Sequence, residues 1–213
     1  MPGRCFCGPE RRAVTHISEG ILSTPVLAAG WAAAAAGLGA GLKKTPPEKL
    51  PETALVSAVL FLASLVHVPL GPSSIHLTLL GLAGIILGWS AVPALFIVLL
   101  LQSVFFQFGG LLSLGVNTAV MGTAALAGRA VFFLWPEKLR LFGAFAGGFT
   151  AVISGAVLVT GALFFSDAGL KATAALLFAA NLPLAAVEGV ITVFITAFLA
   201  KTLPAYVSRQ ARI

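Results

Sequence analysis

Long apolar runs with few charges are the feature that most constrains this chain of 213 residues. A helix that crosses the hydrocarbon core of a bilayer needs about 20 consecutive apolar residues. Seven such runs, some of them shorter, lie at 22–42, 53–68, 74–88, 91–108, 114–135, 141–165 and 172–203. Strands of a membrane barrel would alternate apolar and polar residues, and these runs do not. The sequence therefore predicts an all-α, polytopic integral membrane protein with seven transmembrane helices.

The charge content excludes the common classes of soluble protein. Charged residues make up only 9% of the chain and hydrophobic residues 59%, whereas soluble domains carry about a quarter charged residues. A net charge of +6 would favour nucleic acid as a partner of a soluble protein. Here the bilayer is the expected environment, and no nucleic-acid partner is expected. Cys5 and Cys7 are too few for a disulfide-stabilised scaffold.

The positions of the basic residues predict the orientation in the membrane, because cytoplasmic loops carry an excess of lysine and arginine. Most basic residues follow the first span, surround the end of the fifth or lie at the C-terminal end: Lys43, Lys44, Lys49, Arg129, Lys138, Arg140, Lys201, Arg209 and Arg212. The opposite connections would carry only Lys171. We therefore expect the N-terminus outside and the C-terminus in the cytoplasm.

Residues 1–14 depart from this pattern, because Arg4, Arg11 and Arg12 would lie outside. The segment is polar and rich in glycine and proline, and it lacks the apolar core of a signal peptide. A disordered extension, a processed leader and a mis-annotated start codon all remain open as explanations. Residues 15–213 are expected to form a single seven-helix membrane domain.

All three histidines of the chain are expected at the outer face. His16 precedes the first span, His67 ends the second and His76 opens the third. Imidazole is a common ligand of nickel, cobalt, copper and zinc. The alternative is that these residues simply occupy helix ends at a wet interface. Their common location favours a metal site, although spacing alone does not prove one.

Four segments, at 16–27 (HISEGILSTPVL), 67–88, 106–118 and 181–192 (NLPLAAVEGVIT), resemble one family in the same order. It is the CbiM/NikM family, the metal-binding S component of energy-coupling-factor cobalt and nickel transporters. The resemblance covers nearly the whole chain from about Val14. It implies seven transmembrane helices, in agreement with the number of apolar runs.

The resemblance also implies a ligand set built around the mature N-terminus. In the family, the terminal amine, a deprotonated backbone amide and the imidazole of the second residue bind the ion, together with a histidine before the third helix. By motif, His16 and His76 carry these imidazoles. His67 is either a further ligand or a residue that orients the site. A tetragonal set of nitrogen ligands favours Ni²⁺ or Cu²⁺.

This chain departs from the family pattern because Thr15, and a further 14 residues, precede His16. We expect translation to start at Val14, read as an initiator methionine that is removed before Thr15. The amine of Thr15 would then be a ligand and His16 the second residue. Retention of the initiator would make His16 the third residue, and cleavage of a leader before Thr15 would have the same effect as removal.

Other polar residues have two interpretations each. Glu19 supports the N-terminal segment or is a solvated acid. Gln107 and Asn117 flank a glycine-rich connection that covers the ion, as the resemblance implies, or that forms an ordinary tight turn. Glu188 lies inside the last span, where it serves transport or an interhelical hydrogen-bond network.

The predicted function is that of a transport subunit rather than an enzyme. No Walker motif is found in the sequence, so ATP hydrolysis would fall to separate cytoplasmic ATPase subunits. The resemblance adds a transmembrane coupling (T) subunit, a small accessory membrane subunit and a prokaryotic cell membrane. Co²⁺ or Ni²⁺ is the transported substrate, and the sequence does not choose between them. The alternatives are a stand-alone secondary metal transporter or channel and a membrane metal sensor.

A stripe of small residues marks the first span. Ala28, Ala32, Ala36 and Ala40 recur at every fourth position, which permits close approach of another helix. Internal packing is the favoured interpretation. Docking on the coupling subunit, which the resemblance attributes to alanine-lined helices, is the alternative.

Overall fold

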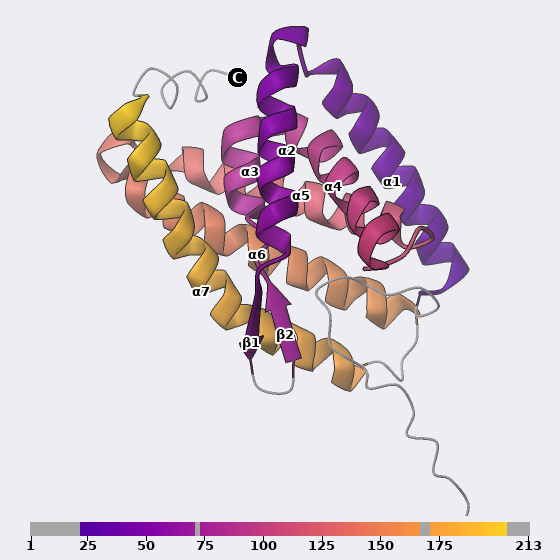
Figure 1. Ribbon diagram of the computed structural model, residues 1–213. Helices are drawn as coiled ribbons and strands as arrows, with labels where there is room; N and C mark the ends of the chain where they lie inside the picture. Colours follow the sequence, from indigo (N-terminus) through magenta and orange to yellow (C-terminus); the bar gives the residue numbers. More distant parts are fainter. Residues whose placement is uncertain (1–21, 71–72, 167–170, 204–213) are drawn as a thin grey trace, which may run out of the picture.

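The computed structural model describes residues 22–70, 73–166 and 171–203, with only the backbone described at 67–70, 73–76 and 171–174. Thr15, His16, Glu19 and the segment 1–14 lie outside the described residues. The helices are α1 (Thr24–Lys43), α2 (Leu50–Ser64), α3 (Leu80–Leu87), α4 (Ala91–Phe106), α5 (Leu114–Leu134), α6 (Arg140–Ser166) and α7 (Lys171–Thr202). Short 3₁₀ turns lie at Pro47–Lys49, Gly88–Ser90 and Glu137–Leu139 (Figure 1).

The helical membrane fold is confirmed in its general form. Among the described residues, five stretches are long and apolar enough to cross a bilayer: Thr24–Lys43, Leu80–Phe106, Leu114–Leu134, Glu137–Ser166 and Ala175–Thr202. With 8 residues, α3 is only about 12 Å long and continues through a 3₁₀ turn into α4. With 15 residues, α2 reaches about 22 Å. The seven-crossing topology therefore stays a prediction.

A two-stranded hairpin replaces the expected helix ends at 67–76. Strands β1 (His67–Leu70) and β2 (Ser73–His76) are antiparallel, with His67 opposite His76 and Leu70 opposite Ser73. The expectation that the second helix ran to 68 and the third began at 74 is wrong. Pro69 has no N–H to donate within a helix, and the Gly71–Pro72 sequence is typical of a turn.

The core of the bundle is α3, which is buried at almost every position. Its neighbours are α5 and α6, and α5 also contacts α1 and α4, while α6 packs along α7. Glycines allow this close approach. A Cβ atom at Gly84 would lie 1.9 Å from the carbonyl oxygen of Ala125, and one at Gly81 would lie 2.5 Å from Cα of Gly148. Small residues are the usual means by which membrane helices approach closely.

Gly84→Ala is therefore expected to lower the stability of the folded protein. The added methyl group meets backbone of α5 rather than a movable side chain, and overpacking of this kind typically costs about 1–3 kcal/mol. The matched control is Gly39→Ala in α1, where an added Cβ atom would meet nothing within 4 Å. Thermal unfolding in detergent should show a lower midpoint for Gly84→Ala than for the wild type, and an unchanged midpoint for the control. Equal midpoints would contradict this packing.

Ala28, Ala32 and Ala36 of the small-residue stripe do not pack inside the bundle, so the internal-packing interpretation is wrong for these three, whereas Ala40 is half-buried. Helix α1 buries Gly30, Ala34 and Gly41, which share one side of the helix because they are 4 and 11 residues apart. Ala28 and Ala32 lie on the opposite side and are exposed, as is Ala36. The 3.6-residue period leaves most of the stripe on the outer surface of the bundle.

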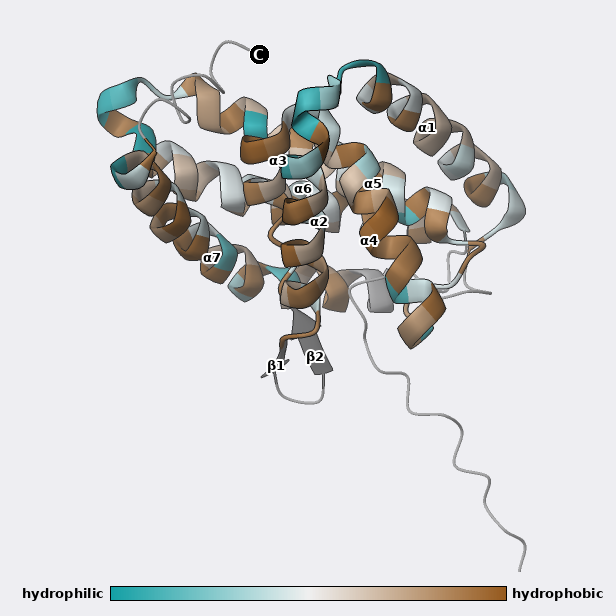
Figure 2. Cartoon of the chain, turned by 45° about the horizontal axis from the view of Figure 1, so that its top comes forward, coloured by the Kyte–Doolittle hydropathy of each residue, from teal (hydrophilic) through white to brown (hydrophobic). Residues whose placement is uncertain are grey.

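The connections gather at two ends of the bundle (Figure 1). We call one the histidine end: the hairpin, the start of α1 and the 107–113 connection. There the N–H of Ser23 donates to Oγ of Ser166 at 3.2 Å, and Trp31 Nε1 donates to the carbonyl of Leu112 at 3.1 Å. We call the other the basic end: the turn after α1, the Gly88–Ser90 link and the end of α5. Figure 2 shows hydrophilic residues concentrated at the turn between α1 and α2.

Candidate metal site

The hairpin brings the two described histidines opposite each other. His67 and His76 are register partners on the antiparallel ladder, where facing Cα atoms lie about 4.5–5.5 Å apart. They are nine positions apart in the sequence, so a turn between them is needed to place them together. The ladder therefore joins two of the predicted ligand positions into one structural unit, directly before α3.

Leu22 and Ser23, the first residues that the structure describes, lie at the same end as the hairpin. Leu22 is buried and packs with Val116, Val120 and Leu163, between α5 and α6. The hydrogen bond between Ser23 and Ser166 fixes the backbone directly before α1. Thr15, His16 and Glu19 precede this point in the chain, and their roles remain predictions.

The glycine-rich connection between α4 and α5 forms a tight turn, which is one of the two interpretations of its sequence. Gln107 ends α4 with a φ of 57°, and Gly109 and Gly110 follow with φ of 78° and 85°. The hydroxyl of Ser113 donates to the carbonyls of both glycines. Gln107 is exposed, whereas Asn117 is buried within the first turns of α5. The two residues thus lie in different environments, and their support of an ion site stays a prediction.

Glu188 of α7 belongs to an interhelical hydrogen-bond network. Its side chain is fully buried, and its Oε1 accepts from the N–H of Thr78, from the Thr78 hydroxyl at 2.6 Å and from the N–H of Leu79 at 3.0 Å. These groups precede α3, so a carboxylate from α7 satisfies free donors at the start of that helix. The positive end of the helix dipole favours a negative charge there.

The same carboxylate holds a strained part of the backbone. Leu79 has a φ of 49°, a left-handed conformation that is unfavourable for a residue with a branched side chain. Its N–H is bound by Glu188, and Thr78 follows His76 by two positions. Sequence reasoning missed Thr78 and Leu79, although a threonine before an apolar run is a known signal of a helix start. The network thereby connects α7 to the hairpin.

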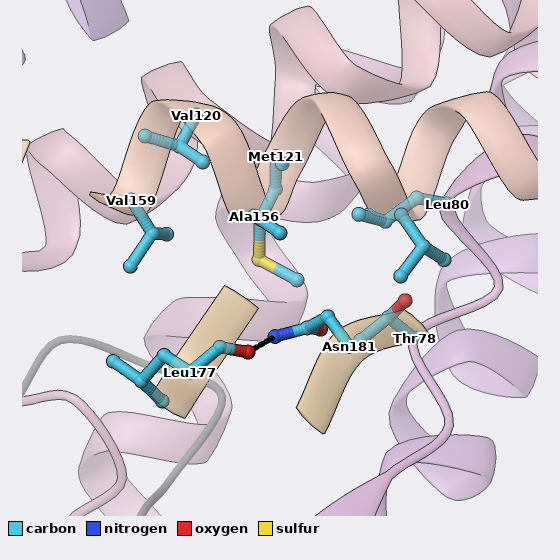
Figure 3. Close-up of a pocket in the computed structure, with 10 residues that line it drawn as sticks. Thr78, Leu80, Val120, Met121, Ala156, Val159, Leu177 and Asn181 are labelled. Carbon is cyan, nitrogen blue, oxygen red and sulfur yellow. Dashed lines mark hydrogen bonds between the residues drawn. The ribbon is translucent and has the colours of Figure 1, made fainter. Parts of the chain in front are cut away.

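A small cavity lies between the start of α3 and helices α5, α6 and α7 (Figure 3). Its volume is about 40 Å³, and its lining is mostly aliphatic, with Thr78 and Asn181 as the polar side chains. The amide of Asn181 already donates to the carbonyl of Leu177 at 2.8 Å. A water molecule fits such a space, but two neutral polar groups do not make an ion site.

A complete ligand set is not found within the described part of the chain, which holds no group of three or more His, Cys, Asp and Glu residues. Within the described residues, the paired backbone positions of His67 and His76 are therefore the part of the predicted ligand set that the structure brings together. The sequence predicts that the remaining ligands come from Thr15 and His16, which lie outside the described residues.

Comparison with known proteins agrees with a metal-transport role. The model of a family described as CbiM, cobalt uptake substrate-specific transmembrane region, matches residues 16–206. A putative metal transport protein from Haemophilus influenzae is 39% identical over 91% of this chain and 97% of its own length. The cobalt transport protein CbiM of Lachnoclostridium phytofermentans is 32% identical over 84% of this chain and 75% of its own length. A crystal structure of a transition metal transporter superposes with a TM-score of 0.71 at 26% identity, covering 87% of this chain and 92% of that one.

Proposed function

The chain belongs to the CbiM family of cobalt and nickel transport components, and on this basis we propose that it is the substrate-specific subunit of an ATP-driven energy-coupling-factor importer. It captures Co²⁺ or Ni²⁺ at the outer face of a prokaryotic cell membrane and has no ATPase activity of its own. The observation that carries this proposal is the register of the hairpin, in which the backbone of His67 lies opposite that of His76, at the end of the bundle where α1 begins.

In the proposed site the ligands are the amine of Thr15, the following backbone amide, and the imidazoles of His16 and His76. His67 either completes the set or orients His76. Amine, amide and imidazole nitrogens suit Ni²⁺ and Co²⁺, and a square-planar set leans towards Ni²⁺. Each of these nitrogen atoms binds the ion only in its deprotonated form, so the affinity for the ion should fall in acid. Glu19, Gln107 and Asn117 are proposed to support the N-terminal segment.

We propose seven crossings, with the histidine end outside and the C-terminus in the cytoplasm. The basic end supports this orientation, because Lys43 and Lys44 end α1 there and Lys49 follows in the same turn. Lys201 lies in the last turn of α7, at the same end of the bundle in Figure 1. An excess of basic residues marks the cytoplasmic side of membrane proteins.

The proposed partners are a transmembrane coupling subunit, two cytoplasmic ATPases and a small accessory membrane subunit. The exposed face of α1 at Ala28, Ala32 and Ala36 supports a docking role, since small residues let another helix approach. A stand-alone secondary transporter usually carries paired intramembrane charges or a broken-helix ion site. Oε1 of Glu188 instead accepts hydrogen bonds from the N–H groups of Thr78 and Leu79, directly before α3.

Uptake measurements test this function. Cells that express the chain with the coupling and ATPase subunits should accumulate Ni²⁺ or Co²⁺ well above cells that lack the chain. Uptake should disappear when the ATPase carries a substitution in its Walker lysine. Radioactive nickel and cobalt, each competed by the other, would also identify the preferred ion.

Two outcomes would contradict the proposal. Full accumulation by the chain alone would favour a stand-alone secondary transporter or channel. Tight ion binding by the purified chain without any effect on accumulation, with all partners present, would favour a metal sensor.

A further inference from the structure

One buried polar atom of α4 is not satisfied by the described residues. Gln102 is 3% exposed, and its Oε1 has no hydrogen-bond partner among them. An unpaired buried acceptor is costly, and buried polar groups without a protein partner are usually bound to an ordered water molecule. This oxygen therefore requires a donor in the space that Gln102 lines.

That space is a cavity of about 10 Å³ between α2, α4, α5 and the segment before α3. Its polar lining residues are Ser64, Thr78 and Gln102, and the others are aliphatic residues and Met121. Thr78 and Met121, which are labelled in Figure 3, also line the neighbouring cavity between α3, α5, α6 and α7. A volume of this size holds one water molecule and little more.

The polar side chains of this cavity offer it acceptors. The Thr78 hydroxyl donates to Oε1 of Glu188 at 2.6 Å, and the Ser64 hydroxyl donates to the carbonyl of Phe61 at 2.6 Å. A hydroxyl has one hydrogen and two lone pairs, so both oxygens can still accept a hydrogen bond but cannot donate another. The amide oxygen of Gln102 only accepts. An occupant that satisfies these oxygens must therefore supply the hydrogens.

We propose that this cavity binds one structural water molecule, which donates one hydrogen to Oε1 of Gln102 and the other to a hydroxyl oxygen of Ser64 or Thr78. Water matches both the volume and the need for two donor hydrogens. It is also neutral, and no charged side chain is found among the described residues that line the cavity. Ca²⁺ and Mg²⁺ take about six or more oxygen ligands, whereas only three polar side chains line this space.

The water lies where it can hold the end of α4 in place. The carbonyl of Gln102 accepts from the N–H of Gln107, at which the 107–113 connection begins. Thr78 lies two residues after His76. A water molecule bonded to Gln102 therefore fixes the part of α4 that carries this connection against α2 or against the segment that follows the hairpin.

A crystal structure of the ion-free full chain, at a resolution that shows ordered water, tests the site directly. We expect one density peak about 2.8 Å from Oε1 of Gln102, within hydrogen-bond distance of a hydroxyl oxygen of Ser64 or Thr78. A well-ordered cavity without a peak overturns the proposal, whether or not the amide of Gln102 then bonds directly to a hydroxyl.

Thermal unfolding in detergent gives a second test, in which the sign of the effect decides. Gln102→Leu deprives a bound water of its partner and should lower the midpoint by about 2–4 °C, the shift expected for one lost hydrogen bond in a chain of this size. If Oε1 has no partner, the same substitution removes an unpaired acceptor and leaves the midpoint unchanged or raises it, which overturns the proposal. The control is Thr196→Val in α7, whose Oγ1 is also buried without a partner among the described residues but does not line the cavity. Its midpoint should not fall.

A sodium ion is the competing occupant, because hard cations also bind oxygen acceptors. Unfolding of the wild type in sodium chloride and in choline chloride at equal concentration distinguishes the two, since choline is too large for the cavity. Bound water predicts equal midpoints in the two salts. A lower midpoint in choline chloride, absent in Gln102→Leu, would assign a cation to the cavity and overturn the water assignment.

Discussion

His76→Ala is expected to abolish tight binding of Ni²⁺ and Co²⁺ to the purified protein. His76 is the proposed fourth nitrogen ligand, and loss of a partner that merely orients a ligand already costs about 10–100-fold in affinity. Loss of the ligand itself should exceed that range. Isothermal titration with each ion gives the affinity, and thermal unfolding of the ion-free protein shows whether the variant is folded. Ser73→Ala in the same strand is the matched control and should bind normally.

His67→Ala distinguishes the two interpretations of His67. A direct ligand should give a loss as large as that of His76→Ala, whereas an orienting residue should give a loss within about 10–100-fold. Mass spectrometry of the same samples identifies the mature N-terminus. Tight binding by a protein with an intact Met1 end would contradict the proposed role of the Thr15 amine, and unchanged affinity of His76→Ala would contradict the site as a whole.

Most helix positions could be predicted from the sequence because local signals mark them. Pro46 and Pro47 separate the first two helices, and Pro136 follows the fifth, so the ends of α1, α4, α5, α6 and α7 lie close to the expected positions. Proline and glycine act through the backbone of their own neighbourhood, which makes their effect readable without any tertiary contact.

The hairpin could not be predicted in the same way. The segment 67–76 is short and only partly apolar, and its few apolar residues do not distinguish a strand from a helix by their periodicity. The ladder between His67 and His76 depends on hydrogen bonds across a turn, and these are not visible in either segment alone. Sequence analysis thus placed both histidines at one face but could not predict that their backbones pair.

The role of Glu188 was undecided for a related reason. Its partners, Thr78 and Leu79, lie 110 and 109 residues away, and a contact of that range carries no local signal. An acidic residue within a span is a functional hypothesis by default. In the structure, Glu188 instead accepts hydrogen bonds from the N–H groups of Thr78 and Leu79, which precede α3. Replacement of Glu188 is therefore the second substitution with a large expected effect.

Glu188→Ala is expected to destabilise the protein strongly and to weaken ion binding. The substitution leaves the buried N–H groups of Thr78 and Leu79 without an acceptor, and each such group costs about 1–3 kcal/mol. The left-handed conformation of Leu79 loses the bond that helps to hold it. Because Thr78 lies only two residues after His76, movement here should displace the backbone of His76. Thermal unfolding and ion titration measure the two effects on one sample.

Glu188→Gln and Thr196→Val separate positioning from general stability. Glutamine retains a carbonyl oxygen for the same donors, so Glu188→Gln should recover much of the ion affinity that alanine loses. Thr196 is also buried in α7, and its Oγ1 has no hydrogen-bond partner among the described residues, so Thr196→Val should change neither quantity greatly. The contrary outcome is a Glu188→Ala protein with a lower melting temperature but an unchanged affinity for Ni²⁺, measured at a temperature where the protein is folded. That result would show that α7 supports α3 without positioning the hairpin. A positioning role predicts that ion affinity is lost in Glu188→Ala, recovered in Glu188→Gln and unchanged in Thr196→Val, because glutamine keeps an acceptor for the N–H groups of Thr78 and Leu79 and alanine does not.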